Sequence, residues 1–158
     1  MTIDATPVLL RSAGVKNYIY HWLYHLRRQA GDDQIRAFPY LNRLGLLNHE
    51  ASVLSRWQTI PRLAILGWTR STRLLDWIVS GSDIFHASNQ IHRAPQRVKL
   101  TATIHDLTCW TMPQFHTTGN IQADRIYAER IWKRADGLIA VSENTRQDAI
   151  QILDIAPE

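Results

Sequence analysis

The stretch Gly137–Leu153 reads GLIAVSENTRQDAIQIL and decides the fold class. Its first five residues form a continuous apolar run, which predicts a short strand over Gly137–Val141. Ser142 follows at once and is a favourable N-cap for a helix that runs to about Leu153, with Glu143 in the first turn, where the helix dipole stabilises negative charge. A strand that passes directly into a capped helix is the repeating step of an α/β domain.

The same alternation extends back toward the N-terminus. Further strands are predicted over Ile3–Leu10, Ile35–Phe38, Asp83–Ala87 and Val98–Ile104, and helices around Tyr18–Leu26, over Thr59–Val79 and over Ile121–Ala135. The segment Tyr40–Trp57 has mixed signals and is predicted to be a loop. This order predicts one α/β, Rossmann-like domain over residues 1–158, with a mainly parallel sheet and helices on both faces.

The predicted helix Thr59–Val79 is strongly amphipathic, with Thr59 as N-cap and Pro61 in its first turn. Its apolar face comprises Ile60, Leu63, Ala64, Gly67, Trp68, Leu74, Leu75 and Ile78, and its polar face Arg62, Thr69, Arg73 and Asp76. The apolar face either packs on the sheet, with the arginines in solvent, or lies on an anionic membrane surface.

Composition limits the classes of function. The 158 residues (18.2 kDa) fit one domain, and 18 basic against 14 acidic residues give a net charge of +4 without a block of like charges typical of a nucleic-acid tail. Such a balance suits anionic partners, such as phosphorylated sugars, nucleotide diphosphates or acidic lipids. The single cysteine, Cys109, excludes an intrachain disulfide and a multi-cysteine zinc site.

No apolar run approaches the ~18 residues that a membrane span requires. Asp4 and Arg11 interrupt the N-terminal region in a way that is atypical of a signal peptide. The expected location is therefore the cytoplasm.

Polar residues follow the predicted strands, where ligands bind in parallel α/β sheets. They lie in Arg11–Lys16, His86–Gln90, His105–Asp106 and Ser142–Thr145. The first strand-to-helix turn holds one glycine, Gly14, rather than the G-x-G-x-x-G of a dinucleotide site, so a nucleotide-dependent oxidoreductase is disfavoured. Gly14 either only makes the turn or lets a ligand approach the backbone.

His105 and Asp106 follow an apolar strand and are expected in the mouth of the crevice, where a histidine near neutral pH donates or accepts a proton or holds a sugar hydroxyl. An alternative is a histidine bound within its own loop. His21 and His25 have the spacing of metal ligands on a helix, but no third ligand is evident and they are expected in solvent.

Six segments, in their order and spacing, resemble the N-terminal domain of the retaining family 4 glycosyltransferases of the GT-B fold. They are Ala13–Val15, Asp83–Asn89 (DIFHASN), Leu100–Leu107 (LTATIHDL), Met112–Pro113, Ala135–Asp136 and Gly137–Thr145 (GLIAVSENT). The resemblance implies the acceptor-binding half of an enzyme that transfers a sugar from a nucleotide sugar to a hydroxyl, in glycan, polysaccharide or glycolipid synthesis. The donor-binding domain of that family is absent from residues 1–158, so the chain is expected to be either a fragment or a lone domain. In both cases this chain alone is expected not to transfer efficiently.

The resemblance also implies roles for individual residues. His105 corresponds to the catalytic histidine that reaches the donor sugar, and substrate-binding positions are Gly14, Val15, Asn89, Asp106, Ser142 and Glu143. Retention is attributed to same-face attack with the leaving diphosphate as base, so neither a side-chain nucleophile, a metal nor a further cofactor is expected. The implied partners are a nucleotide sugar, a glycan, small-molecule or lipid-linked acceptor, and the inner membrane face by peripheral contact. The alternative is a noncatalytic α/β binding or regulatory domain.

Overall fold

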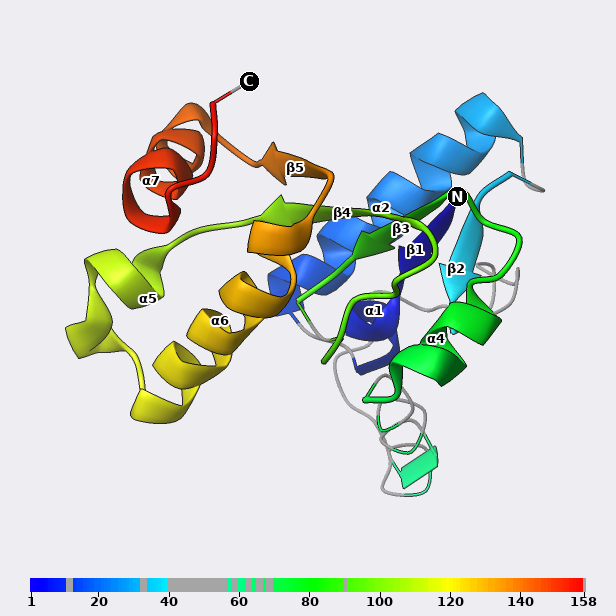
Figure 1. Cartoon of the computed structure of the whole chain (residues 1–158), viewed down its shortest axis with the longest axis horizontal. Coiled ribbons are helices and arrows are strands. Elements are labelled where there is room, and N and C mark those ends of the chain that lie inside the picture. The colour runs from blue at the N-terminus through cyan, green and yellow to red at the C-terminus, as the bar shows by residue number, and fades with distance from the viewer. Residues whose placement is uncertain are drawn as a thin grey trace. The chain divides into compact units, whose positions relative to one another are not determined.

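The computed structural model describes residues 1–10, 13–31, 34–39, 57, 60, 61, 64, 67, 70–89 and 91–157 (Figure 1). The chain divides into two compact units, Met1–Lys99 and Leu100–Glu158. Both contain helices and parallel strands, which confirms the predicted α/β class. The predicted loop Tyr40–Trp57 lies outside the described residues, apart from Trp57 itself.

The first unit has a parallel sheet in the order β2-β1-β3. Its elements are β1 (Thr2–Asp4), α1 (Thr6–Leu10), α2 (Ala13–Ala30), β2 (Arg36–Phe38), α4 (Thr72–Ile78) and β3 (Ile84–Ala87). The register sets Ile3 of β1 opposite Ala37 and His86. Because the strands are parallel, their carboxyl ends lie at one edge, where the candidate residues of this unit are expected.

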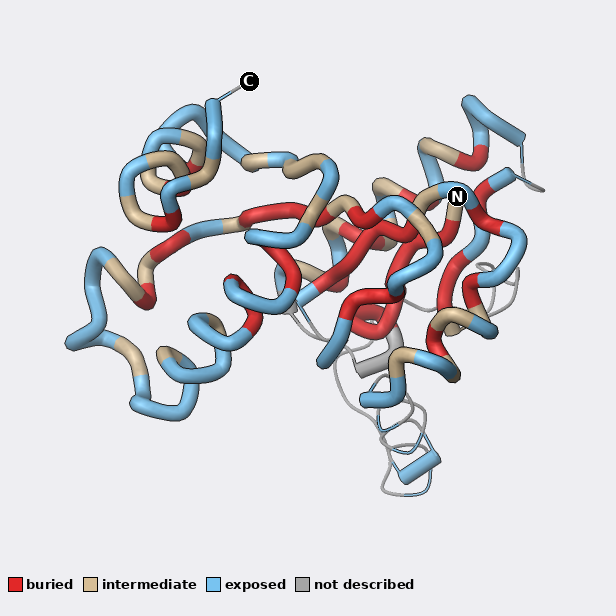
Figure 2. The backbone as a smooth tube through the Cα atoms, in the orientation of Figure 1, coloured by how far each residue is buried: buried red, intermediate tan, exposed pale blue. Residues whose placement is uncertain are grey.

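Helix α2 buries one side against this sheet, as its apolar periodicity predicts. Ile19 and Leu23 belong to the same core cluster as Ile3 of β1 and Ala37 of β2. The strands are largely buried, as the red tube in Figure 2 shows. Helix α2 ends at Ala30, before Gly31, whose N–H donates to the Arg27 carbonyl at 2.9 Å and whose φ of +92° is one that glycine adopts without strain.

The predicted strand Ile3–Leu10 is wrong in its second half, because β1 ends at Asp4 and residues Thr6–Leu10 form α1. The Asp4 carboxylate accepts the Thr6 N–H at 3.0 Å and so satisfies a donor at the start of this helix. Pro7 lies within the apolar run that predicted a strand. It fits the first turn of a helix, because the backbone N–H that proline lacks has no acceptor within the helix there.

The predicted helix Thr59–Val79 is also wrong as a continuous element. Arg70 lies in a turn, and Ser71 begins α4 as an N-cap that accepts the Leu74 N–H at 3.4 Å. Leu75 is buried as expected, whereas Ile60, on the face predicted to pack on the sheet, is 63% exposed. The predicted N-cap Thr59 and the central Trp68 lie outside the described residues.

The second unit is built on the parallel pair β4–β5, in which Thr101 lies opposite Gly137 and Ile104 opposite Ala140. Its elements are β4 (Lys99–Ile104), α5 (Thr108–Thr111), η2 (Pro113–Phe115), α6 (Thr118–Arg130), η3 (Trp132–Arg134), β5 (Gly137–Ala140) and α7 (Glu143–Leu153). The short α5 and η2 are not predicted from the sequence. Its core includes Ala102 of β4, Ile131 after α6 and Ala149 of α7.

Helix α6 begins three residues before the predicted Ile121, because Thr117 caps it by accepting the Asn120 N–H at 3.2 Å. The predicted end at Ala135 is reached through η3, a 3₁₀ turn, rather than as continuous α-helix. No helix in the described part of the chain is both long and apolar enough to cross a membrane.

Candidate functional site

His105 and Asp106 directly follow β4, as expected, and Asp106 is held by the chain that comes after it. Its Oδ1 accepts the Thr108 N–H at 3.0 Å and the Thr108 Oγ–H at 2.6 Å. Burial alone would raise the pKa of Asp106, but these hydrogen bonds, together with His116 and His105, lower it. Asp106 is therefore a carboxylate at neutral pH.

The half-buried His105 is neutral at pH 7, because burial lowers the pKa of its imidazole and Asp106 only partly opposes this effect. A neutral imidazole has one N–H donor and one ring-nitrogen acceptor. Such a group can donate a hydrogen bond to a hydroxyl oxygen or accept one from a hydroxyl, and its unprotonated nitrogen can take up a proton. His105 therefore suits recognition of a polyhydroxylated ligand more than attraction of an anion by fixed charge.

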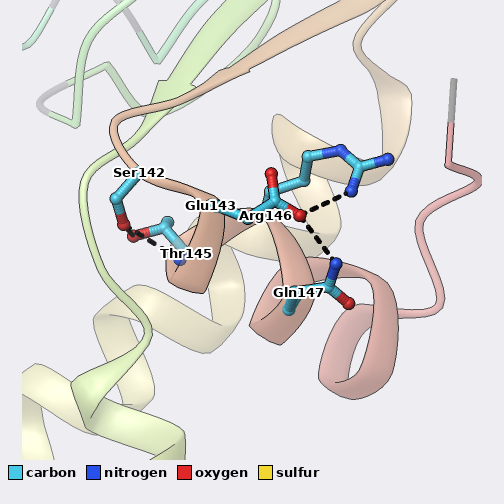
Figure 3. Close-up of polar contacts among 5 residues, drawn as sticks. All are labelled: Ser142, Glu143, Thr145, Arg146 and Gln147. Atoms are coloured by element: carbon cyan, nitrogen blue, oxygen red, sulfur yellow. Dashed lines mark hydrogen bonds and ion pairs between the residues drawn. The ribbon is translucent and has the colours of Figure 1, made fainter.

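Ser142 is the N-cap of α7, which confirms the sequence prediction (Figure 3). Its Oγ accepts the Thr145 N–H at 3.1 Å and lies 3.0 Å from the Thr145 Oγ1. Thr145 in turn donates from Oγ1 to the His105 carbonyl at 3.4 Å. The start of α7 is thereby tied to the residue that follows β4, and the unit gathers His105, Asp106 and Ser142 at the carboxyl ends of its two strands.

Glu143 lies in the first turn of α7, and its side chain contacts residues of the same helix. One carboxylate oxygen accepts from Arg146 Nη1 at 2.9 Å and from Gln147 Nε2 at 2.7 Å (Figure 3). The hydrogen bond from Gln147, followed by the contact with Arg146, lowers the pKa of Glu143 despite an opposing desolvation effect. Glu143 is exposed, so a ligand that binds it must compete with these partners.

In the first unit, Gly14 lies not in a turn before the helix, as predicted, but together with Val15 in the first turn of α2. Helix α1 occupies much of the predicted first strand, and helix α2 begins at Ala13. A Cβ on Gly14 would meet no atom within 4 Å, so packing does not require glycine there. The exposed backbone remains open to a ligand.

Asn89 lies in the turn that follows β3, beside a polar cluster that the sequence does not predict. The buried Asp4 accepts the Ser88 N–H at 3.2 Å and the Ser88 Oγ–H in addition to the Thr6 N–H. Burial raises the pKa of Asp4, and the hydrogen bonds from Ser88 and Thr6 only partly offset this. Asp4 thus joins the ends of β1 and β3 and fixes the turn that carries Asn89.

Two further residues act at this site. Thr145 belongs to the predicted polar segment Ser142–Thr145, but its contact with His105 is not predicted, and His116 is not predicted at all. His116, at the end of η2, acts electrostatically on Asp106, and Thr145 links Ser142 to His105. The signal for Thr145 is its place three residues after an N-cap serine. His116 lies in a segment with no regular pattern, so no sequence signal points to it.

His21, His25 and His86 belong to the first unit. His21 and His25 are exposed on α2, and within the described ranges no three His, Cys, Asp or Glu residues are grouped to hold a metal ion. His86 is buried and contacts the Trp22 ring at a centroid distance of 4.3 Å. Burial, with Asp124 nearby, raises the pKa of Cys109 to about 11, so its thiol is protonated at neutral pH.

Each unit thus contains its own set of candidate polar groups. The second unit presents His105, Asp106 and Ser142, and the first presents the opening turn of α2 and Asn89. Comparison of the chain with protein-family models, curated proteins and solved structures finds no match.

Proposed function

We propose that the chain is the N-terminal, acceptor-binding part of a retaining glycosyltransferase that moves a sugar from a nucleotide sugar to a hydroxyl acceptor. The observation that carries the proposal is the hydrogen-bonded connection from Ser142 through Thr145 to His105 at the carboxyl ends of β4 and β5. The segments that contain these residues, Leu100–Leu107 and Gly137–Thr145, are among those that resemble family 4 glycosyltransferases.

The chemistry of His105 supports this function. A half-buried neutral imidazole can accept from a sugar hydroxyl and donate to another oxygen without attracting a competing anion. Asp106, an ionised carboxylate beside it, stabilises any positive charge that His105 acquires in the transition state. In the proposed reaction the leaving diphosphate serves as the base, so the side chains bind and polarise the sugars and form no covalent intermediate.

The test is a transfer assay of the natural full-length protein across common nucleotide sugars, comparing wild type with His105→Ala. The expected result is a fall in kcat/KM of at least about 10²-fold, the scale typical of a lost acid–base or polarising group. His25→Ala is the matched control, because His25 is exposed on α2, and it is expected to retain wild-type turnover. Circular dichroism checks that both variants are folded.

Unchanged turnover in His105→Ala would refute the role of His105. The absence of turnover with every donor and acceptor tried would favour the second candidate, a noncatalytic α/β binding or regulatory domain. The hydrogen bonds that occupy Glu143 favour this candidate, because a carboxylate held by Arg146 and Gln147 is not free to bind substrate unless these contacts break.

A further inference from the structure

We propose that the free edge of β5 is an interface at which two copies of this chain pair as antiparallel strands and form a symmetric dimer. The interface lies in the second unit and does not depend on sugar transfer. Strand β5 extends over Gly137–Ala140 and, among the described residues, pairs with β4 alone.

The burial of β5 differs from that expected of a strand inside a parallel sheet. Such strands are usually covered on both faces. Four of the six residues of β4 are buried, whereas no residue of β5 is. Ile139 and Val141, which follows the strand, are 43% and 48% exposed. Strand β5 therefore has the exposure of a strand that lacks one neighbour.

The free edge of β5 faces a groove. On the paired edge, the Val141 N–H donates to the Ile104 carbonyl at 3.2 Å. Because successive residues of a strand direct their backbone groups to opposite sides, Leu138 and Ala140 direct their N–H and C=O groups away from β4. Both residues line the groove, and its other wall includes Leu153 of α7. An incoming strand would therefore find backbone donors and acceptors beside an apolar wall.

The charges along the groove fit a second copy that runs in the opposite direction. Asp136 precedes β5, and Arg146 lies at the end of the first turn of α7, which follows β5. A two-fold axis makes the paired strands antiparallel, so Asp136 of each copy comes beside the start of α7, and hence Arg146, of the other. Arg146 binds Glu143 through Nη1, but a guanidinium has five N–H donors and can bind a second carboxylate. The other charged residues of the groove, Lys133 and Asp154, have opposite signs, so no excess charge favours an ionic ligand.

One register satisfies the free backbone groups of both copies. If Leu138 lies opposite Ala140 of the second copy, the two residues exchange N–H···O=C hydrogen bonds, and the symmetry repeats this pair. Ile139 then lies opposite Ile139 of the second copy, at a position where the Cα atoms are about 4.5 Å apart. The two exposed isoleucine side chains contact each other across the axis, and such cross-strand pairs stabilise a sheet.

Analytical ultracentrifugation of the whole chain tests the interface, and a concentration-dependent dimer is expected for wild type. Ala140→Pro removes an N–H that faces the free edge and leaves the hydrogen bonds to β4 in place. It is expected to raise the dissociation constant at least about 10-fold, because symmetry removes two hydrogen bonds from each dimer. Arg146→Glu is also expected to weaken the dimer. Arg130→Glu is the matched control, because it makes the same charge change at an exposed residue of α6 and should leave the dimer unchanged.

Disulfide cross-linking tests the register without depending on the proline variant. Ile139→Cys is expected to link two chains under mild oxidation, because a Cα separation of about 4.5 Å lies within the range of a disulfide. Ile126→Cys is the control, because Ile126 is 41% exposed but lies on α6, and the native Cys109 is buried. Circular dichroism checks that all variants are folded.

Three results would overturn the proposal, whatever the transfer assay shows. The first is a wild-type chain that stays monomeric at every concentration, which would leave the edge of β5 to a strand of another protein. The second is a dimer of wild-type affinity in folded Ala140→Pro. The third is cross-linking of Ile139→Cys that is no faster than that of Ile126→Cys.

Discussion

Asp4 shows how one buried side chain can determine the course of the chain around it. Its two carboxylate oxygens accept from Thr6 and Ser88, residues that lie 2 and 84 positions away in sequence. Because all three groups are buried, each backbone N–H depends on Asp4 for its hydrogen bond. One carboxyl group therefore connects the end of β1 with the start of α1 and with the turn after β3.

Replacement of Asp4 by alanine is expected to lower the free energy of unfolding by about 2–4 kcal/mol, because it leaves two buried N–H groups without acceptors. Asp4→Asn is expected to cost less, since its amide retains one acceptor oxygen. Urea denaturation measures both changes. Asp83→Ala, at an exposed position, serves as control and should change stability by less than about 0.5 kcal/mol. An equal effect of Asp4→Ala and Asp83→Ala would contradict this account.

His105 is expected to titrate below the ordinary histidine pKa of 6.5, because burial disfavours its charged form. The unfolded chain then binds a proton more readily than the folded chain, so the contribution of His105 to stability falls as the pH drops below 6.5. Asp106→Asn is expected to lower the His105 pKa further, because the Asp106 carboxylate raises it. NMR titration of the imidazole protons measures the His105 pKa in wild type and in Asp106→Asn. A wild-type pKa above 6.5, or a higher His105 pKa in Asp106→Asn than in wild type, would refute the proposed effects of burial and of Asp106.

Among the secondary-structure elements, a capping side chain determines where some of the helices begin. Ser142 begins α7, and Ser71 begins α4 after the turn at Arg70. The Ser71 cap divides what its apolar periodicity predicts to be one long helix. Periodicity extends across such a break because it reports which side chains are apolar and contains no information on where the backbone turns.

Ser142→Ala is expected to lower the free energy of unfolding by about 1 kcal/mol, because the Thr145 N–H loses its acceptor at the start of α7. Ser142→Asp is expected to retain most of the stability, since aspartate is an equally good cap and its charge suits the helix dipole. Chemical denaturation measures both variants. Ser80→Ala, an exposed serine in a turn, is the control, and a loss in Ser142→Asp as large as that in Ser142→Ala would rule out capping as the cause.

At the scale of the whole molecule, β5 presents an apolar edge. It pairs with β4 and with no other strand of the described chain, and its sequence, GLIA, contains no charge or proline that discourages further pairing. Ile139 is 43% exposed on this strand. An uncovered apolar edge of this kind promotes association between chains.

Ile139→Lys is therefore expected to slow aggregation of the concentrated chain several-fold, measured by light scattering during mild heating. Ile126→Lys is a closely matched control, because Ile126 is 41% exposed but lies on helix α6, whose backbone hydrogen bonds are satisfied internally. It is expected to have a smaller effect. Equal slowing by the two substitutions would show that added charge, rather than the strand edge, controls association.

The amino-acid sequence was sufficient to predict the α/β class, most strand positions and the N-cap at Ser142. It also placed His105, Asp106 and Ser142 at strand ends. These features depend on residues within a few positions of each other, whose periodicity, turn preference and capping act through the adjacent backbone. A linear pattern is sufficient to reveal them.

Three features became evident only from the folded chain: residues Thr6–Leu10 are helical, Ile60 is exposed and Lys16 is buried. It alone revealed the contacts of Asp4 with Ser88 and of Thr145 with the His105 carbonyl. The physical reason is that burial and hydrogen-bond partnership arise between segments far apart in the chain. An apolar run or a lone lysine has the same sequence signature whether or not a distant segment covers it.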